Sequence, residues 1–153
     1  MKTSESAGYV EETIRTLFRT QKLAVLSTHS SGQPYASLVA FVASEDLEHL
    51  YFATIRTTRK YNNLAVDPRV AMLIDSRSNL DSDIHAAVAV TATGTATEVR
   101  DQEKTQSIEL YLSKHPYLQD FIRAESCALI RVSVQTYYLV SRFQQVMELR
   151  LLP

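Results

Sequence analysis

Residues 9–20 place apolar side chains on one face of a helix. Val10, Ile14, Leu17 and Phe18 recur at helical spacing, and two glutamates stand at positions 11 and 12. This spacing predicts an amphipathic helix over about 9–20 whose apolar face lies against a sheet. The glutamates in its first turn would interact favourably with the helix dipole.

A period of two residues runs from Val88 to Val99, where threonines alternate with valine, alanine and glycine. Such alternation predicts a long strand. Gly94 stands in its middle and predicts a bulge or a tight bend, a feature that lets a strand turn the corner of a small barrel.

The remaining apolar segments predict further elements. Strands are expected at residues 23–28, 35–43, 48–54, 69–75, 127–134 and 137–141, with a hairpin turn over His29–Gln33. Helices are expected over 57–66, over 101–113 with Asp101 as its cap, and in a short segment with Pro116 at its first position. No repeat or linker divides residues 1–153, so we expect one domain with a C-terminal tail at about 143–153. This order predicts a mainly β fold with inserted α-helices, built as a small antiparallel barrel of six or more strands.

Charge and composition narrow the classes of function. The 16 Lys and Arg residues nearly balance 17 Asp and Glu, giving a net charge of -1, so we expect neither nucleic acid nor a membrane as partner. Apolar runs such as Val39–Ala43 are too short to cross a bilayer, and residues 1–8 lack an apolar signal core, which favours a cytoplasmic protein. The 3 glycines cannot form a P-loop or a Rossmann fingerprint.

The segment Leu50–Leu64 has the residues of an anion site. It is a strand that leads into a helix, and the helix opens with hydroxyls and cations. Thr57 and Thr58 can cap the helix and donate hydroxyls to a phosphate, while Arg59 and Lys60 supply positive charge beside the free N–H groups of the helix start. The alternative is an ordinary threonine cap followed by a solvated Arg-Lys pair.

Five motifs along the chain occur in the order found in one known family. They are Leu23-Ala-Val-Leu-Ser-Thr28, Gly32-Gln-Pro-Tyr35, Phe52-Ala-Thr54 followed by Thr58-Arg-Lys60, Asn63-Leu64, and Asp67-Pro-Arg-Val70. Through these motifs nearly the whole chain resembles the FMN-binding split barrels related to pyridoxamine 5'-phosphate oxidase. The resemblance implies a six-stranded antiparallel split β-barrel of the FMN-binding type.

The resemblance also implies a homodimer that holds two FMN molecules in clefts between the protomers. The residues that match by position fall into three groups. Thr58, Arg59 and Lys60 would hold the phosphate, Ala53 and Thr54 would lie beside the isoalloxazine, and Ser37, Leu38 and Val39 would line the cleft.

Two departures from the oxidase pattern concern the substrate. Ser37 and Val42 stand where the oxidase has an Arg and a Lys near FMN and substrate, and Arg142-Phe-Gln144 stands near the place of its late Arg-x-His pair. These differences disfavour oxidation of pyridoxine phosphate and leave the expected FMN binding in place.

Several other polar residues have either a role at a cofactor or a purely structural role. Arg77 and Asn79, in a polar loop with Asp83, could reach a flavin across a dimer interface, or form a solvated turn. Gln144 could face the flavin ring or be a surface amide. The histidines at positions 29, 49, 85 and 115 have no metal-ligand spacing, so we expect no metal. Cys127, the single cysteine, is expected to be a buried packing residue.

The sequence therefore predicts an FMN-dependent oxidoreductase acting on a small substrate, with NADH or NADPH as possible reductant. No catalytic acid or base stands out, which agrees with a flavoprotein, in which the cofactor carries the electron chemistry. Two alternatives stay open. One is a non-catalytic protein that binds flavin or haem, with one of the histidines as axial ligand. The other is a reductase that uses a deazaflavin.

Overall fold

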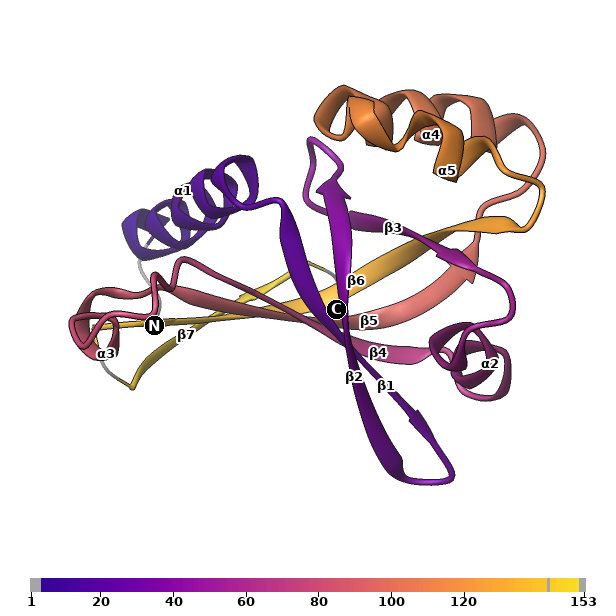
Figure 1. The fold of residues 1–153 in the computed structure, drawn as a ribbon. Coiled ribbons are helices and arrows are strands. Elements are labelled where there is room, and N and C mark those ends of the chain that lie inside the picture. Colours follow the sequence, from indigo (N-terminus) through magenta and orange to yellow (C-terminus); the bar gives the residue numbers. More distant parts are fainter. Residues whose placement is uncertain (1–3, 143, 152–153) are drawn as a thin grey trace.

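Six antiparallel strands form a closed barrel at the centre of the computed structural model, which describes residues 4–142 and 144–151 (Figure 1). The strand order is β3-β2-β1-β4-β5-β6, and β3 also pairs with β6, which closes the ring; β7 adds to the free side of β6. The strands are β1 (Leu23–Ser30), β2 (Gln33–Ala43), β3 (His49–Ile55), β4 (Arg69–Asp75), β5 (Ala89–Glu98), β6 (Cys127–Ser141) and β7 (Gln145–Arg150). The mainly β fold and the six-stranded barrel predicted from the sequence are confirmed.

The helices lie between and around these strands. They are α1 (Ser4–Thr20), α2 (Arg59–Val66), α3 (Asp83–Ala86), α4 (Gln102–Lys114), the 3-10 turn η1 (Pro116–Leu118) and α5 (Gln119–Arg123). Among the described residues, no helix combines the length and the apolar character needed to span a membrane.

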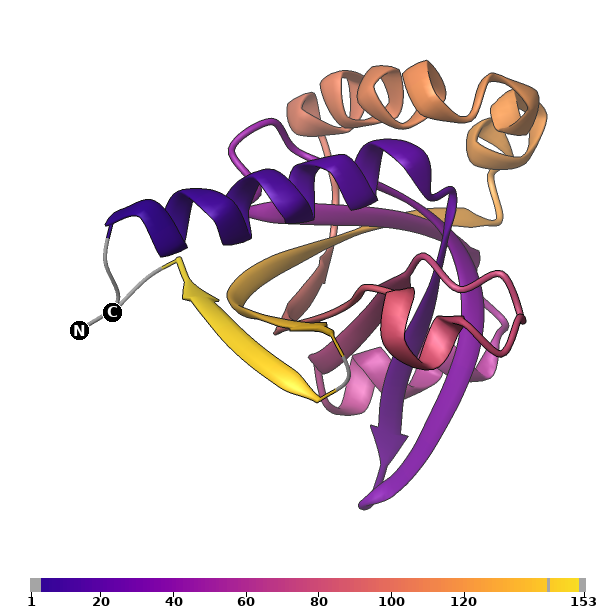
Figure 2. The same cartoon turned by 90° about the vertical axis from the view of Figure 1, so that its left-hand side faces the viewer.

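Helices α1 and α2 lie at opposite ends of the barrel (Figures 1 and 2). The apolar face predicted for α1 joins the barrel core through Val10, Ile14, Leu17 and Phe18. Helix α2 packs on the barrel through Tyr61, Leu64 and a buried amide, since Asn63 Nδ2 donates to Thr28 Oγ1 at 3.0 Å. The core is thus covered at both ends.

A second apolar cluster lies outside the barrel. Tyr111 of α4 and Ile122 of α5 pack there with Val42, Ala53 and Leu129 of β2, β3 and β6. The outward-facing residues of β1, β4 and β5, by contrast, remain partly exposed along each strand. One side of the barrel is therefore covered by helices and the other is not.

A β-bulge explains why the last barrel strand is longer than predicted from the sequence. Residues 127–141 form one strand, β6, where two strands were expected. Thr93 pairs with Thr136 but Gly94 pairs with Val134, so Gln135 is an extra residue in β6. The bulge shifts the alternation of buried residues from Val132 and Val134 to Tyr137 and Leu139, and this phase change looks like a strand boundary.

The sequence predicted a bulge or a bend at Gly94, and the structure has a bulge there, with the extra residue on the facing strand β6. A Cβ at this position would lie 2.2 Å from the backbone oxygen of Ser133 on β6. Only a glycine allows the two strands to approach this closely where the register shifts.

Other boundaries differ from the predicted ones. The expected tail contains β7, which pairs with β6 from Gln145 to Arg150 and shows no regular burial alternation. Positions 143, 152 and 153 lie outside the described residues.

The starts of two helices also differ from the predicted ones. Helix α1 begins at Ser4 rather than near residue 9, and α2 begins at Arg59 rather than residue 57. Asp101 precedes α4 but its side chain makes no capping hydrogen bond, and the polar loop after β4 contains the short helix α3. The β1–β2 turn is only Ser31–Gly32, both with positive φ, as a two-residue hairpin requires.

Candidate functional site

The turn between β3 and α2 is fixed by the hydroxyl of Thr58, the N-cap of α2. Thr58 Oγ1 accepts a hydrogen bond from Tyr61 N at 3.4 Å and donates one to the carbonyl of Ile55 at 2.9 Å. The capping role predicted for Thr58 is confirmed. Thr57 is exposed and precedes the cap, so the hydroxyl of Thr57 does not cap the helix.

The start of α2 carries two positively charged side chains, Arg59 and Lys60. Among the described residues, no carboxylate lies within ion-pair distance of Arg59 or Lys60, whereas Arg56 and Arg69 both have carboxylate partners. The Arg59 guanidinium carbon lies 5.4 Å from the ring centroid of Tyr35, which brings the start of α2 close to the start of β2. The first backbone N–H groups of a helix have no carbonyl partner within it. This turn therefore offers hydroxyl, backbone and cationic donors, the set that suits a phosphate.

Strands β2 and β3 part beside this turn. Their ladder joins only Phe41–Ala43 to Leu50–Phe52, although β2 extends back to Gln33 and β3 continues to Ile55. The predicted cofactor residues on β2 (Ser37, Leu38 and Val39) and on β3 (Ala53 and Thr54) all lie beyond the end of the β2–β3 ladder, although they pair with β1 and β6 on their other edges. Part of this edge is occupied, because the Tyr111 hydroxyl of α4 donates to the carbonyl of Ala40 at 3.3 Å.

Strand alternation separates the side chains of these residues. On β2, Val39 is buried in the barrel core, whereas Leu38 lies on the outer face with 62% of its surface exposed. Ser37 Oγ is buried and has no hydrogen-bond partner among the described residues. On β3, Ala53 belongs to the outer cluster and Thr54 is buried with its hydroxyl 2.9 Å from that of Thr58. The residues lie in one region, but they face both sides of the barrel wall.

Three predicted candidates lie away from this region within the same chain. β4 begins beside α2 and leads away from it over seven residues, about 20 Å, before Arg77 and Asn79 follow. Arg77 forms an ion pair with Asp75 at 3.0 Å, and Asn79 N donates to Asp83 Oδ2 at 2.7 Å. Gln144 is exposed in the turn between β6 and β7. A role for these three at a flavin stays a prediction that depends on a second protomer.

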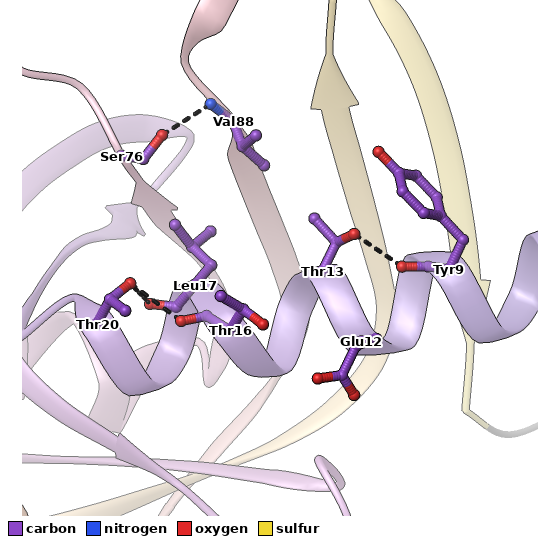
Figure 3. Close-up of a pocket in the computed structure, with 8 residues that line it drawn as sticks. All are labelled: Tyr9, Glu12, Thr13, Thr16, Leu17, Thr20, Ser76 and Val88. Carbon is purple, nitrogen blue, oxygen red and sulfur yellow. Dashed lines mark hydrogen bonds between the residues drawn. The ribbon is translucent and has the colours of Figure 1, made fainter.

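A groove that was not predicted from the sequence lies between α1 and the ends of β4 and β5 (Figure 3). It has a volume of about 380 Å³ and is lined by Tyr9, Glu12, Thr13, Thr16, Leu17, Thr20, Ser76 and Val88. Threonines at positions 13, 16 and 20 share a helix face, and this spacing is the signal that could have indicated the groove. Thr13 and Thr20 donate their hydroxyls to carbonyls of α1 itself, so these two side chains offer a ligand no free proton.

A second missed feature is the amine of Lys114. Lys114 Nζ donates to the carbonyl of Phe18, in the last turn of α1, at 2.8 Å and lies 3.8 Å from the ring centroid of Phe41. Burial lowers the pKa of Lys114 to about 8. The adjacent His115 is fully buried, with Nε2 2.7 Å from the carbonyl oxygen of Phe41. These two residues join α4 to α1 and β2.

The histidine and cysteine side chains have local explanations. Cys127 is buried, as predicted, and burial raises the pKa of its thiol. The structure brings ligand atoms of Asp46, Glu48 and His49 within 4.8 Å of one another, a grouping that histidine spacing alone did not indicate. Asp46 Oδ1 accepts from the Ser44 hydroxyl at 2.6 Å and from Glu48 N at 2.9 Å. Asp46 thus stabilises the turn between β2 and β3.

The chain is similar in fold to solved structures of low sequence identity. A haem-binding protein from Mycobacterium smegmatis is 20% identical with a TM-score of 0.81, and the match covers 98% of this chain and 59% of that one. HutZ, the haem storage protein from Vibrio cholerae, is 20% identical with a TM-score of 0.74, covering 86% of this chain and 94% of that one. An FAD-binding protein from Mesorhizobium loti is 16% identical with a TM-score of 0.68, covering 84% and 90%.

The sequence also matches a family model. A search of curated proteins gives no match. The model of the pyridoxamine 5'-phosphate oxidase family matches residues 10–141, which include the barrel from β1 to β6 and the turn at Thr58. The chain therefore belongs to the pyridoxamine 5'-phosphate oxidase family.

Proposed function

We propose that this chain is an FMN-binding flavoprotein that acts as an FMN-dependent oxidoreductase on a small molecule. The observation that carries the proposal is the start of α2, where Arg59 and Lys60 follow a capping threonine and have no carboxylate partner among the described residues. An unpaired pair of cations at a helix N-terminus suits a phosphomonoester of about two negative charges.

The residues of the turn would have different roles in holding the phosphate. Arg59 and Lys60 would donate charge-assisted hydrogen bonds, and Arg59 is already held over Tyr35. The Thr58 hydroxyl is engaged with Ile55 O, so Thr58 would act chiefly by keeping the helix start in place. Thr57 is exposed and makes no capping bond, which leaves its hydroxyl free for the phosphate.

The flavin ring would lie where β2 and β3 part. Backbone groups of Ala53 and the neighbouring Thr54 lie beyond the β2–β3 ladder, so the edge of β3 that faces β2 is unpaired there. Ser37 Oγ on the facing strand is a buried polar atom without a partner among the described residues, and a polar ligand group would satisfy it. This donor set fits a ring with a polar edge.

We propose a homodimer as the functional unit. Val25 of β1 pairs with Leu38 of β2 on one side and with Leu73 of β4 on the other, which places three apolar residues in one row on the uncovered face. A contiguous, partly exposed row of apolar side chains on a protein surface is typical of an interaction site. A second copy would bury Leu38 next to the Ser37 and Val39 candidates, and its Arg77, Asn79 and Gln144 could then approach the same flavin.

Bound FMN would supply hydride or electron transfer, with NADH or NADPH as the reductant. The residues of the chain would bind and orient the cofactor and exclude water from one face of it. Val42 is buried in the outer cluster where the oxidase has a lysine, so this position offers no charge to a phosphorylated substrate. The substrate is therefore expected to differ from pyridoxine phosphate.

Haem binding is a second candidate function, because two of the similar solved structures are named for haem. Both ring nitrogens of His115 lie within hydrogen-bond distance of partners, and His29 Nε2 lies 2.9 Å from Asp67. His49, half-buried at the start of β3, or His85 in α3 would be the axial ligand in this alternative. A deazaflavin reductase would use the same phosphate contacts as FMN.

The visible absorption spectrum of the purified protein, with mass identification of what it releases on denaturation, separates these candidates. Flavin bands and released FMN would support the proposal. A Soret band would favour haem, and a released deazaflavin would favour the third candidate. A colourless protein that takes up no added FMN would overturn the proposal.

A further inference from the structure

The carboxylate of Glu98, at the end of β5, joins the two sides of the turn between β3 and α2. Its Oε1 accepts from Arg56 Nε at 3.2 Å and from the Tyr61 hydroxyl at 3.0 Å. Arg56 immediately precedes residues 57–60, and Tyr61 immediately follows them. One carboxylate oxygen therefore bridges the two residues that flank positions 57–60, the segment proposed to hold the phosphate.

Arg56 is in turn anchored to a third segment. Its guanidinium Nη1 donates to the carbonyl of Glu125 at 2.7 Å, and its backbone N–H donates to the carbonyl of Ser126 at 3.0 Å. These residues directly precede β6, so the entry to the turn is tied to β5 through Glu98 and to the start of β6. The turn cannot move as a unit without breaking these bonds.

Glu98 is a charged group in a largely shielded place. Its side chain is 13% exposed, and its second oxygen, Oε2, accepts from Arg100 Nε at 3.2 Å. Burial alone would raise the pKa of Glu98, but the hydrogen bonds from Arg56 and Tyr61 hold this pKa below its usual value. The carboxylate is thus ionised at neutral pH and has two cationic partners.

The negative charge of Glu98 lies close to the proposed phosphate site and affects its charge balance. A carboxylate near a phosphate site would by itself repel the ligand. Glu98 is paired with Arg56 and Arg100, whereas Arg59 and Lys60 have no carboxylate partner among the described residues. Glu98 therefore pairs with Arg56, while Arg59 and Lys60 at the helix start remain available for a phosphate.

We propose that Glu98 is a positioning residue for the phosphate end of the cofactor. By holding Arg56 and Tyr61 on one oxygen, Glu98 sets the conformation of residues 57–60 and so determines how strongly the site prefers a phosphorylated flavin over an unphosphorylated one. This inference rests on the proposed function. It concerns a residue outside the motifs that indicated the phosphate site.

The test compares the affinities of the apoprotein for FMN and for riboflavin, which lacks the phosphate, in the wild-type protein and in Glu98→Gln. This substitution keeps the shape of the side chain but removes its charge. The charge of Glu98 is already balanced by Arg56 and Arg100, so its loss relieves little repulsion of the phosphate. The weakened bond to Arg56 no longer fixes residues 57–60, so we expect one charge-assisted hydrogen bond to the phosphate to be lost and FMN affinity to fall about 10-fold, with riboflavin affinity unchanged. Glu12→Gln is the control for the change in net charge, since Glu12 is exposed on α1 at the other end of the barrel.

A second variant keeps the carboxylate. Tyr61→Phe removes only the hydroxyl that lies 3.0 Å from Glu98 Oε1, and we expect a smaller loss in the same direction. If both variants lose affinity for FMN and riboflavin equally, or lose neither, the positioning role is wrong. If the wild-type protein binds FMN no more tightly than riboflavin, the proposed phosphate site itself is wrong, so the two failures are distinguishable.

Discussion

The hydroxyl oxygens of Thr54 and Thr58 lie 2.9 Å apart, which joins the last buried residue of β3 to the N-cap of α2. Both hydroxyls also lie within hydrogen-bond distance of the carbonyl of Ile55, Thr58 Oγ1 at 2.9 Å and Thr54 Oγ1 at 3.3 Å. The strand and the helix start are therefore held by one short chain of hydroxyl bonds. The proposed phosphate contacts follow directly from this arrangement.

Replacement of Thr58 by valine should lower the free energy of unfolding by about 1 kcal/mol, because the helix loses its cap. Urea unfolding followed by circular dichroism measures the change. Thr57→Val is the matched control, since Thr57 is exposed and does not cap the helix. Equal destabilisation by the two substitutions would contradict the assignment of the cap.

Gly94→Ala should lower the free energy of unfolding by about 2–4 kcal/mol, because the new methyl group would meet the backbone of Ser133 and force the strands apart. Gly8→Ala serves as the control in the same thermal or urea experiment. Gly8 lies in α1 with nothing within 4 Å of its added Cβ, so this change should be neutral or stabilising. A Gly94→Ala variant as stable as the wild type would show that β5 and β6 tolerate a wider separation.

The deprotonation of Lys114 should raise the free energy of unfolding as the pH rises from about 8 to 10.5. Burial lowers the folded-state pKa to about 8 from the ordinary 10.5, so in this window the unfolded chain binds more protons than the folded one. Below pH 8 both states carry the charge and the cost is constant. Because the amine is only partly buried, we expect a rise of about 1–2 kcal/mol relative to Lys114→Met.

Unfolding curves at several pH values for the wild type, Lys114→Met and the exposed-residue control Lys22→Met measure this difference. Titrating tyrosines contribute equally to all three proteins, so the comparison isolates the lysine. Parallel stability profiles for wild type and Lys114→Met would mean that the amine is solvated in the folded protein.

Leu38→Glu should shift the protein from dimer to monomer and release FMN, because two charges would be buried on the apolar row formed with Val25 and Leu73. Sedimentation and flavin fluorescence at several protein concentrations measure both effects. Val66→Glu is the control, since Val66 is 76% exposed on α2 and lies outside this row. A monomer that retains FMN would contradict the shared cleft.

Features that depend on neighbouring residues could be predicted from the sequence. The Thr58 cap and the cations after it belong to one helix start, and Gly94 interrupts an alternating strand with a residue that has no side chain. In each case the signal and its structural consequence lie within a few residues. The element order predicted a small antiparallel barrel, and the family motifs added its six-stranded split form and the expectation of an FMN cofactor.

Features that depend on distant residues could not be predicted. The extra residue Gln135 in β6 is defined only by the register with β5, and the sequence alone shows it as a break between two strands. The bond from Arg56 to Glu98 spans 42 positions, and that from Lys114 to Phe18 spans 96.

Titration of the apoprotein with FMN, for the wild type and for Arg59→Ala/Lys60→Ala, tests the central proposal most directly. The double variant should bind FMN more weakly by about 2–5 kcal/mol, because two charge-assisted hydrogen bonds to the phosphate are lost, while riboflavin affinity should stay the same. A folded double variant that binds FMN as tightly as the wild type would contradict the assignment of the cofactor to this turn.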